Sequence, residues 1–261
     1  KYISGNPSLQ VVNVEGGGSI TGANEFVNAR EHDGYNLLTT SASTHIPFLL
    51  GQSSVQYDLN KLKPVIGFPT GGVVYVSPNT GVEKPADIVN PDEPLVYAGI
   101  SASGLDLITL LSYEVLGANV EAVLGYEGRG PSRVAFEQGE SNIDYQTSSA
   151  FIESVSPLIE RNMATPLYSF GQIDESGELI RDPQFPDLPT VKEVYVDIHG
   201  KDPSGPAWEA YKTLVSASFS IQKVVWLHSD APEPAVEALN KAALSITEDP
   251  ELMEKGEEII G

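Results

Sequence analysis

The chain has 261 residues, of which 41% are apolar, so it can bury the core of one large domain or of two lobes. It contains 36 acidic and 15 basic residues, and the resulting net charge of −21 excludes nucleic acid and anionic membranes as favourable partners, because their phosphates bind positive surfaces. It contains no cysteine, which excludes disulfides and thiolate metal sites.

Short runs rich in β-branched residues alternate with helical patterns, which is typical of βαβ units. In the first part of the chain we expect strands at Leu9–Val14 and Tyr35–Thr40 and further extended segments at Lys63–Phe68 and Val73–Ser77. We expect helices at Thr21–Arg30 and Pro85–Val89 and a flexible turn at Gly16–Ser19. No apolar run approaches the roughly 18 residues of a membrane span, and we expect a secreted protein whose signal peptide is absent from this chain.

The second part of the chain continues the alternation. We expect strands at Leu95–Ala98, Val120–Leu124, Asn142–Tyr145 and Ile221–Leu227. We expect helices at Gly104–Leu116, Ser132–Gln138, Phe151–Arg161, Trp208–Ser216, Pro234–Thr247 and Leu252–Ile260. Asp174–Pro189 is dense in proline, glycine and acids and is expected to be a surface loop.

Three strands run into small hydroxyl residues where a helix should begin. These junctions are Ser41–Thr44, Ser101–Gly104 and Gln146–Ser149. The first N–H groups of a helix lack intrahelical partners and carry partial positive charge, so they can hold an anion, and hydroxyls add further donors. Ligands of open α/β sheets bind outside the carboxyl ends of the strands. The junctions therefore indicate a carboxylate or phosphate site, although each hydroxyl residue could act only as a helix N-cap.

A serine hydrolase is an alternative, because Gly99–Ser103 is similar to the Gly-x-Ser-x-Gly elbow, with Ser101 as the nucleophile. The elbow's last glycine is replaced by Ser103, and only His199 and His228 follow Ser101 as bases. We therefore expect no catalytic residue. The four histidines show no metal-ligand spacing, so we predict no metal site and no cofactor.

Two more side chains could contact an anion. His45 directly follows the first junction, and Arg129 lies in the glycine-rich stretch Gly125–Ser132. Arg129 could pair with a ligand carboxylate, although a solvated surface arginine is an equally simple interpretation.

In their order, these segments resemble the substrate-binding receptors of tripartite tricarboxylate transporters, often called Bug proteins, over nearly the whole chain. The motifs that carry the resemblance are Glu15–Ala23, Asp33–Leu38 leading to Ser43–His45, Leu95–Gly99, Gly125–Gly128, Leu188–Val191 and Ala231–Pro232. The resemblance implies an α/β protein with the two-lobed type II periplasmic binding fold. It also implies a periplasmic, monomeric receptor that closes on a small organic carboxylate, aliphatic or aromatic, and passes it to integral membrane permease subunits. A sensor domain that binds a similar ligand for signalling is the alternative.

In this family, backbone N–H groups, hydroxyls and bridging water hold the carboxylate. The resemblance implies ligand contacts from Ser43, Thr44 and His45 in lobe one and from Ser101, Ser103, Gly104, Tyr126 and Thr147 in lobe two, with Arg129 as a further candidate. We place lobe one at 1–92 and 218–261 and lobe two at 93–217, with hinge strands near Val73–Ser77 and Ile221–Leu227.

The chain departs from the family pattern at two places. Family members begin with a strand and a glycine-rich loop, whereas Lys1–Gly5 looks like the tail of the first helix, so we expect the strand and loop to be missing from this chain. Glu127 stands where the family often has a lysine, so charge does not indicate which carboxylate is bound.

Overall fold

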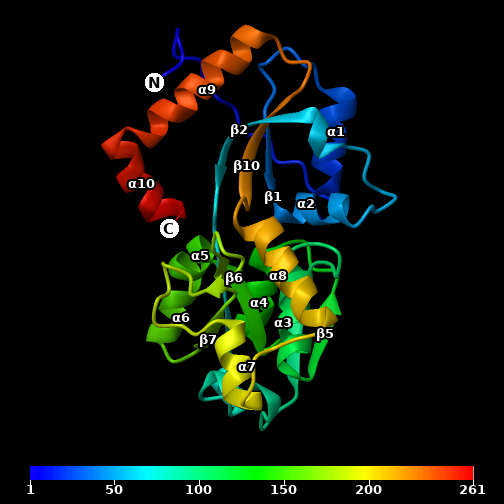
Figure 1. Cartoon of the computed structure of the whole chain (residues 1–261), viewed down its shortest axis with the longest axis vertical. Coiled ribbons are helices and arrows are strands. Elements are labelled where there is room, and N and C mark those ends of the chain that lie inside the picture. The colour runs from blue at the N-terminus through cyan, green and yellow to red at the C-terminus, as the bar shows by residue number, and fades with distance from the viewer. Residues whose placement is uncertain (261) are drawn as a thin grey trace. The chain divides into compact units, whose positions relative to one another are not determined.

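The structure is a computed structural model that describes residues 1–260, with side chains described through residue 256. The chain divides into two compact units (Figure 1). Unit 1 contains Lys1–Pro69 and the segment from Ile221 to the C-terminus, and unit 2 contains Thr70–Ser220. The predicted α/β class with two lobes is confirmed.

The boundary between the units differs from the expected one. We expected lobe two to begin at residue 93, but unit 2 begins at Thr70. Strand β3 (Gly72–Val76) is hydrogen-bonded on both sides to strands of unit 2, so backbone pairing fixes it in that unit. The second boundary, expected after residue 217, lies after Ser220.

Unit 1 is a three-stranded antiparallel sheet with helices on its faces. The strands are β1 (Leu38–Ser41), β10 (Lys223–His228) and β2 (Leu62–Phe68), in the order β1-β10-β2. The helices are α1 (Ile20–Ala29), α2 (Ala42–Leu49), α9 (Glu233–Thr247) and α10 (Pro250–Ile260), with 3₁₀ turns at Gly17–Ser19 and Leu59–Lys61.

The central strand β10 of unit 1 is covered on both faces. Val224 and Trp226 pack with Phe26 of α1, whereas Leu227 packs with Val236 of α9. This follows from the period of two in a strand, which sends successive side chains to opposite faces. The uninterrupted apolar run of the sequence is therefore explained by a strand buried on both sides.

Unit 2 is built on a five-stranded mixed sheet in the order β5-β4-β6-β3-β7. Its other strands are β4 (Leu95–Gly99), β5 (Val120–Leu124), β6 (Ile143–Thr147) and β7 (Thr165–Ser169), and β8 (Gln172–Ile173) with β9 (Leu179–Ile180) forms a small hairpin. β4 is parallel to both β5 and β6, whereas β3 is antiparallel to its neighbours.

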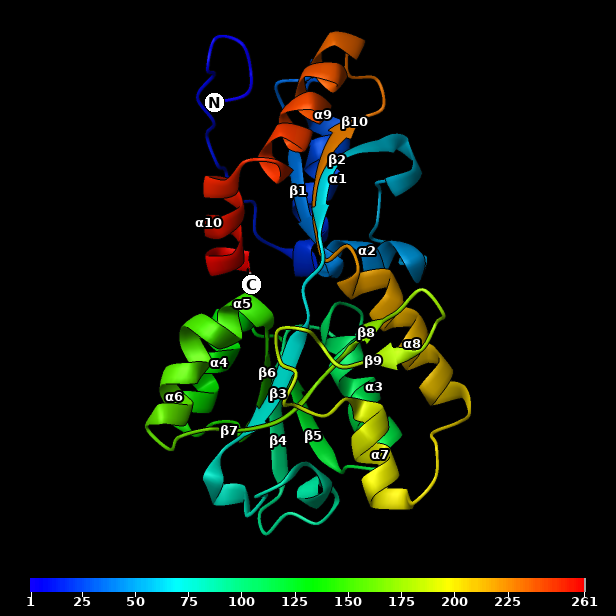
Figure 2. The ribbon, with the colours of Figure 1, turned by 60° about the vertical axis from the view of Figure 1, so that its left-hand side comes forward.

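Helices lie on both faces of the unit 2 sheet (Figure 2). They are α3 (Asp106–Leu116), α4 (Arg129–Gln138), α5 (Ser148–Ala150), α6 (Ser156–Glu160), α7 (Val191–His199) and α8 (Pro206–Phe219), with a π-helical turn at Phe151–Val155 and 3₁₀ turns at Pro78–Thr80 and Pro85–Val89. On one face, Tyr75 of β3 packs with Phe136, Phe151 and Leu158.

Three local expectations differ from the structure. Leu9–Val14 was expected to be a strand, but among the described residues it forms none, and its side chains Leu9 and Val11 are more than four-fifths exposed. Helix α7 was not expected, although Thr190 and Glu193 form the capping box that marks its start. The surface loop 174–189 contains the short strand β9 and one fully buried acid, Asp182. No helix of the described residues is long and apolar enough to cross a membrane.

Two valines of unit 2 test the position of the core. Val155 is fully buried, whereas Val134 of α4 is 42% exposed. We expect Val155→Ala to lower the free energy of unfolding by about 2 kcal/mol, because it removes buried apolar atoms and leaves a cavity. Val134→Ala should change it by no more than about 0.5 kcal/mol. Urea denaturation measures both, and equal losses would contradict the assigned core.

Candidate functional site

Three of the expected contact segments of unit 2 lie at one edge of its sheet. β4, β5 and β6 are parallel, so their carboxyl ends point the same way. The Ser101–Gly104 loop follows β4, Tyr126 follows β5, and Thr147 ends β6. Backbone bonds from Gly125 and Tyr126 to the Gly99 carbonyl oxygen, at 3.0 and 3.1 Å, tie the first two turns together.

The carboxylate of Asp106 organises the first of these turns. Asp106 is the first residue of α3 and is 2% exposed. One of its oxygens accepts the N–H groups of Ile100 and Ser101, at 2.7 and 2.9 Å, and the other accepts the Tyr97 hydroxyl at 2.6 Å. The Ser101 N–H, which the sequence offered to a ligand, and the preceding Ile100 N–H are therefore bound by the protein's own anion.

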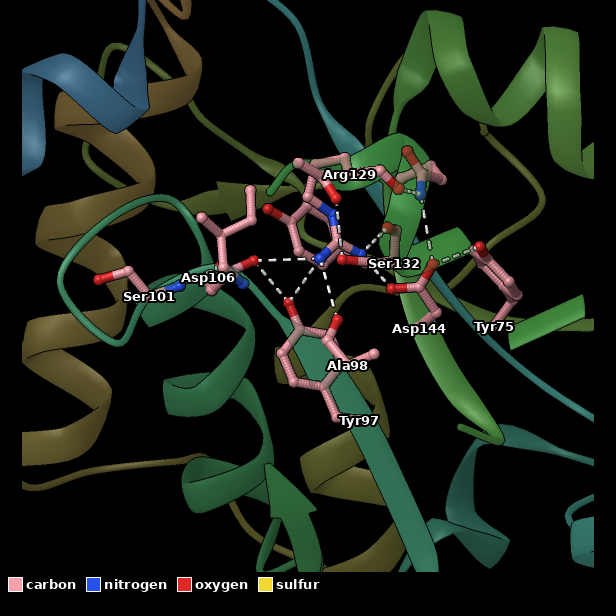
Figure 3. Close-up of polar contacts among 12 residues, drawn as sticks. Tyr75, Tyr97, Ala98, Ser101, Asp106, Arg129, Ser132 and Asp144 are labelled. Atoms are coloured by element: carbon pink, nitrogen blue, oxygen red, sulfur yellow. Dashed lines mark hydrogen bonds and ion pairs between the residues drawn. The ribbon is translucent and has the colours of Figure 1, made fainter. Parts of the chain in front are cut away.

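Arg129, the first residue of α4, lies behind this turn (Figure 3). One terminal nitrogen of its guanidinium donates to Asp106 at 3.2 Å, to Tyr97 at 3.0 Å and to the Ala98 carbonyl at 3.2 Å. The other donates to Asp144 and to the Tyr145 carbonyl. The guanidinium also stacks over the Tyr145 ring, 4.1 Å from its centroid.

Asp144 is the second carboxylate of this network and is fully buried. It accepts the Tyr75 hydroxyl at 2.6 Å and the Gln146 side-chain amide at 3.3 Å, and Gln146 also donates to the Arg129 carbonyl at 3.0 Å. Burial raises the pKa of Asp144, and the Arg129 charge and the Tyr75 hydroxyl only partly offset this. Burial alone would lower the pKa of Arg129, but Asp144, Tyr97, Tyr145 and Asp106 raise it above its usual range. The arginine is therefore a permanent internal cation.

The hydroxyls of the first turn are paired with each other. Ser101 Oγ and Ser103 Oγ are 2.8 Å apart, and Ser101 Oγ accepts the Ser103 N–H at 3.2 Å. Both contacts of the Ser101 hydroxyl are with Ser103, which is not a base, so among the described residues this hydroxyl lacks the base that a hydrolase nucleophile needs. Gly104 donates to the Ser101 carbonyl, whereas the N–H groups of Ala102 and Leu105 have no protein acceptor among the described residues.

Thr147 ends β6 beside a buried acidic group. The Thr147 side chain is partly exposed and has no hydrogen-bond partner among the described residues. The next residue, Ser148, donates its N–H to the Gly71 carbonyl at 3.2 Å. A Cβ on Gly71 would lie 1.8 Å from Asp182 Oδ2, so only glycine fits there. Burial raises the pKa of Asp182, whereas the Gln184 N–H and the Ser148 hydroxyl act in the opposite direction.

Tyr126 and Arg129 have different positions at this edge. Tyr126 is partly exposed, and its hydroxyl donates to Glu140 at 3.3 Å. The Arg129 side chain is 15% exposed and points into the network rather than to solvent (Figure 3). Its terminal nitrogens already have two carboxylate and two carbonyl partners, which leaves only Nε without a partner.

The three candidate residues of unit 1 lie at the start of α2. Ser43 is partly exposed, but Thr44 and His45 are 2% and 3% exposed. His45 Nε2 lies 2.9 Å from Thr40 Oγ1, which also accepts the Trp226 indole N–H at 2.8 Å. Burial lowers the pKa of His45 to about 4. His45 is therefore a neutral core residue of unit 1 at physiological pH.

Sequence reasoning missed the acids of this site. Asp106 and Asp144 lie two residues from predicted junctions and Asp182 lies in the expected surface loop, and all three look like surface acids in a chain with 36 acidic residues. For Asp106, a signal was present, because an acid in the first turn of a helix binds free N–H groups. For Asp144 the signal was a charged residue between Ile143 and Tyr145 inside an expected strand.

No family model matches the sequence, and no curated protein is similar to it in sequence. The structure is similar to solved periplasmic binding proteins. The periplasmic binding protein BugD has 18% sequence identity and a TM-score of 0.68, over 94% of this chain and 74% of BugD. MatC of Rhodopseudomonas palustris, solved with malate, has 17% identity and a TM-score of 0.66, over 94% and 75% of the two chains. Rpa4515 of R. palustris, solved with adipate, has 20% identity and a TM-score of 0.66, over 90% and 71%. The predicted resemblance to the Bug proteins is thus confirmed at the level of the fold.

Two arginines of α4 test the buried network. Arg129→Met should lower the free energy of unfolding by about 3–5 kcal/mol, because it leaves two buried carboxylates without their cation. Arg133 pairs only with Glu137 at the surface, so Arg133→Met should cost less than about 1 kcal/mol. Urea denaturation compares them, and Asp144→Asn added to Arg129→Met should recover part of the loss. A small effect of Arg129→Met would contradict the network.

His45 gives the unit 1 junction a pH dependence. Its pKa of about 4 in the folded protein lies below its usual 6.5, so the unfolded chain takes up a proton first as the pH falls. The free energy of unfolding should therefore drop between pH 6.5 and pH 4, by up to about 3 kcal/mol from this group. The free energy of unfolding should drop less in His45→Gln than in the wild type, whereas His199→Gln should show the same drop as the wild type. Identical profiles of wild type and His45→Gln would contradict a buried neutral His45.

Proposed function

We propose that this protein is an extracytoplasmic receptor that binds a small organic carboxylate at the edge of unit 2 formed by the carboxyl ends of β4, β5 and β6. The observation that carries the proposal is that the turns after β4 and β6 lie at the same edge and carry hydrogen-bond donors, among them two N–H groups without a protein acceptor among the described residues. The donors assigned to the ligand are the N–H groups of Ala102 and Leu105 and the hydroxyls of Ser101, Ser103 and Thr147.

The Arg129 network explains why such a site could be selective for an anion. The Asp106 carboxylate next to the turn would repel a ligand carboxylate if it stood alone. Arg129 lies 3.2 Å from Asp106 on the buried side and reduces the repulsion from its charge, so the N–H and O–H dipoles of the turn can act on a ligand in front of it. We assign Arg129 and Asp106 as positioning residues of the site, and the ligand contacts to the turn in front of them.

The proteins with a similar fold support a carboxylate as ligand. MatC was solved with malate and Rpa4515 with adipate, both of them dicarboxylates. Two other proteins with a similar fold, a periplasmic transporter and the periplasmic binding protein BugD, support a periplasmic location, transfer of the ligand to membrane permease subunits and a binding role rather than catalysis. These points belong to the proposal for this chain.

Closure of the two lobes remains a prediction. The chain passes between the units twice, at Pro69–Thr70 and at Ser220–Ile221. The N–H of Thr70 donates to the Phe219 carbonyl at 3.0 Å, so the two connections are joined just inside unit 2. Closure predicts a smaller radius of gyration with ligand than without it, which small-angle scattering measures.

A thermal-shift screen of mono-, di- and tricarboxylates tests the proposed function. A ligand at 100 times its Kd should stabilise the folded protein by about 2.7 kcal/mol. Malate and adipate are the first probes, with the corresponding diols as uncharged controls. Stabilisation by no small organic anion would contradict the receptor proposal.

A pair of serine variants tests the location of the site. Ser103→Asp places a carboxylate among the donors of the turn and should weaken binding of the identified carboxylate by about tenfold or more, through like-charge repulsion. Ser204 is exposed in the loop before α8, so Ser204→Asp adds the same charge away from the sheet edge and should leave the Kd unchanged. Calorimetric titration measures the Kd of both variants. Equal affinities of Ser103→Asp and Ser204→Asp would show that the ligand does not bind at this turn.

A further inference from the structure

Two histidines that are far apart in the sequence meet in unit 1. His32 lies in the loop between α1 and β1, and His228 is the last residue of β10, followed by a turn that contains Asp230. Their imidazole rings are stacked, with centroids 3.3 Å apart and planes inclined by 10°. Neither histidine belongs to the proposed carboxylate site.

The nitrogens of both rings face one carboxylate oxygen. Asp230 Oδ2 lies 3.9 Å from His32 Nδ1 and 3.6 Å from His228 Nδ1. A tetrahedral zinc ion with bond lengths of about 2.0–2.2 Å holds its ligand atoms about 3.3–3.5 Å apart. The two distances to Asp230 Oδ2 are therefore within a few tenths of an ångström of this spacing, and the ligand atoms of all three residues lie within 4.8 Å of one another.

Protonation and exposure also suit a metal ion. The Asp230 N–H donates to His228 Nδ1 at 3.2 Å, so this nitrogen carries no proton, and a metal ion would replace the Asp230 N–H as the partner of its lone pair. The side chains of His32 and His228 are 28% and 12% exposed, which limits their freedom, whereas that of Asp230 is 75% exposed and leaves an entry path.

We propose that His32, His228 and Asp230 form a binding site for a first-row divalent transition-metal ion, with water completing the coordination. Two imidazoles and one carboxylate suit zinc, nickel or copper, whereas magnesium and calcium take oxygen ligands. Because the lone pair of an imidazole lies in its ring plane, one ring must rotate out of the stack when the ion binds. His32, which is the more exposed histidine and lies in a loop, is the ring that rotates.

Binding at this site would link two segments of unit 1. The ion would join the loop after α1 to the end of the central strand β10. The net charge of −21 raises the local concentration of cations around the protein, which favours binding but also requires a control for non-specific association.

Calorimetric titration with zinc ion alone tests the proposal on the full chain, in about 0.15 M salt, where Coulomb interactions are screened over about 8 Å. We expect one zinc per chain, unaffected by a large excess of magnesium. His32→Gln and His228→Gln should each weaken binding by at least about tenfold. His199→Gln, which changes an exposed histidine of α7, should leave it unchanged.

Thermal unfolding provides a second readout that also reports on folding. Zinc should raise the Tm of wild type and of His199→Gln, but not that of His32→Gln or His228→Gln, each compared with its own metal-free Tm. A cobalt titration should give the visible absorption of a tetrahedral site only where both histidines are present. The proposal would be overturned by equal zinc affinity of all variants, by displacement of zinc by magnesium, or by the absence of saturable binding. Zinc would then bind only non-specifically, to surface carboxylates.

Discussion

The ion pairs of Arg129 with Asp106 and Asp144 are the interaction on which the edge of unit 2 depends. Burying these charges is costly, and the cost is recovered only if every partner is correctly placed. Asp106 starts α3, Arg129 starts α4, and Asp144 lies in β6, so the pairs join two helices to the sheet. The same requirement fixes the turn after β4, because Asp106 uses its second oxygen to bind the N–H groups of Ile100 and Ser101.

In the proposed site, this arrangement would let an acidic protein bind an anion without a free basic side chain. The guanidinium compensates the carboxylates from inside the unit, and the surface of the turn is left with small residues, hydroxyls and N–H groups. At contact distance these dipoles decide the potential, whereas the net charge of −21 acts over longer distances and is screened by salt.

Histidine shows most clearly how the environment decides chemistry in this protein. His45 follows a predicted ligand junction, but the core of unit 1 encloses it and favours its neutral form. His32 and His228 have no meaningful spacing in the sequence, yet the fold stacks them beside Asp230. Contact between residues that are distant in sequence was therefore needed to distinguish a core imidazole from a candidate metal ligand.

The sequence by itself determined most of the strands and helices and the three junctions, because these depend on local periodicity and on turn residues. β5 has the expected limits, and β6 differs from expectation only at its ends. The tertiary structure alone decided that β3 belongs to unit 2, that Leu9–Val14 pairs with no strand and that Asp182 is buried in a loop. It also decided that Arg129 faces Asp106 and Asp144. The physical reason is that strand pairing and burial of charge depend on partners distant in the chain, which no local pattern of residues specifies.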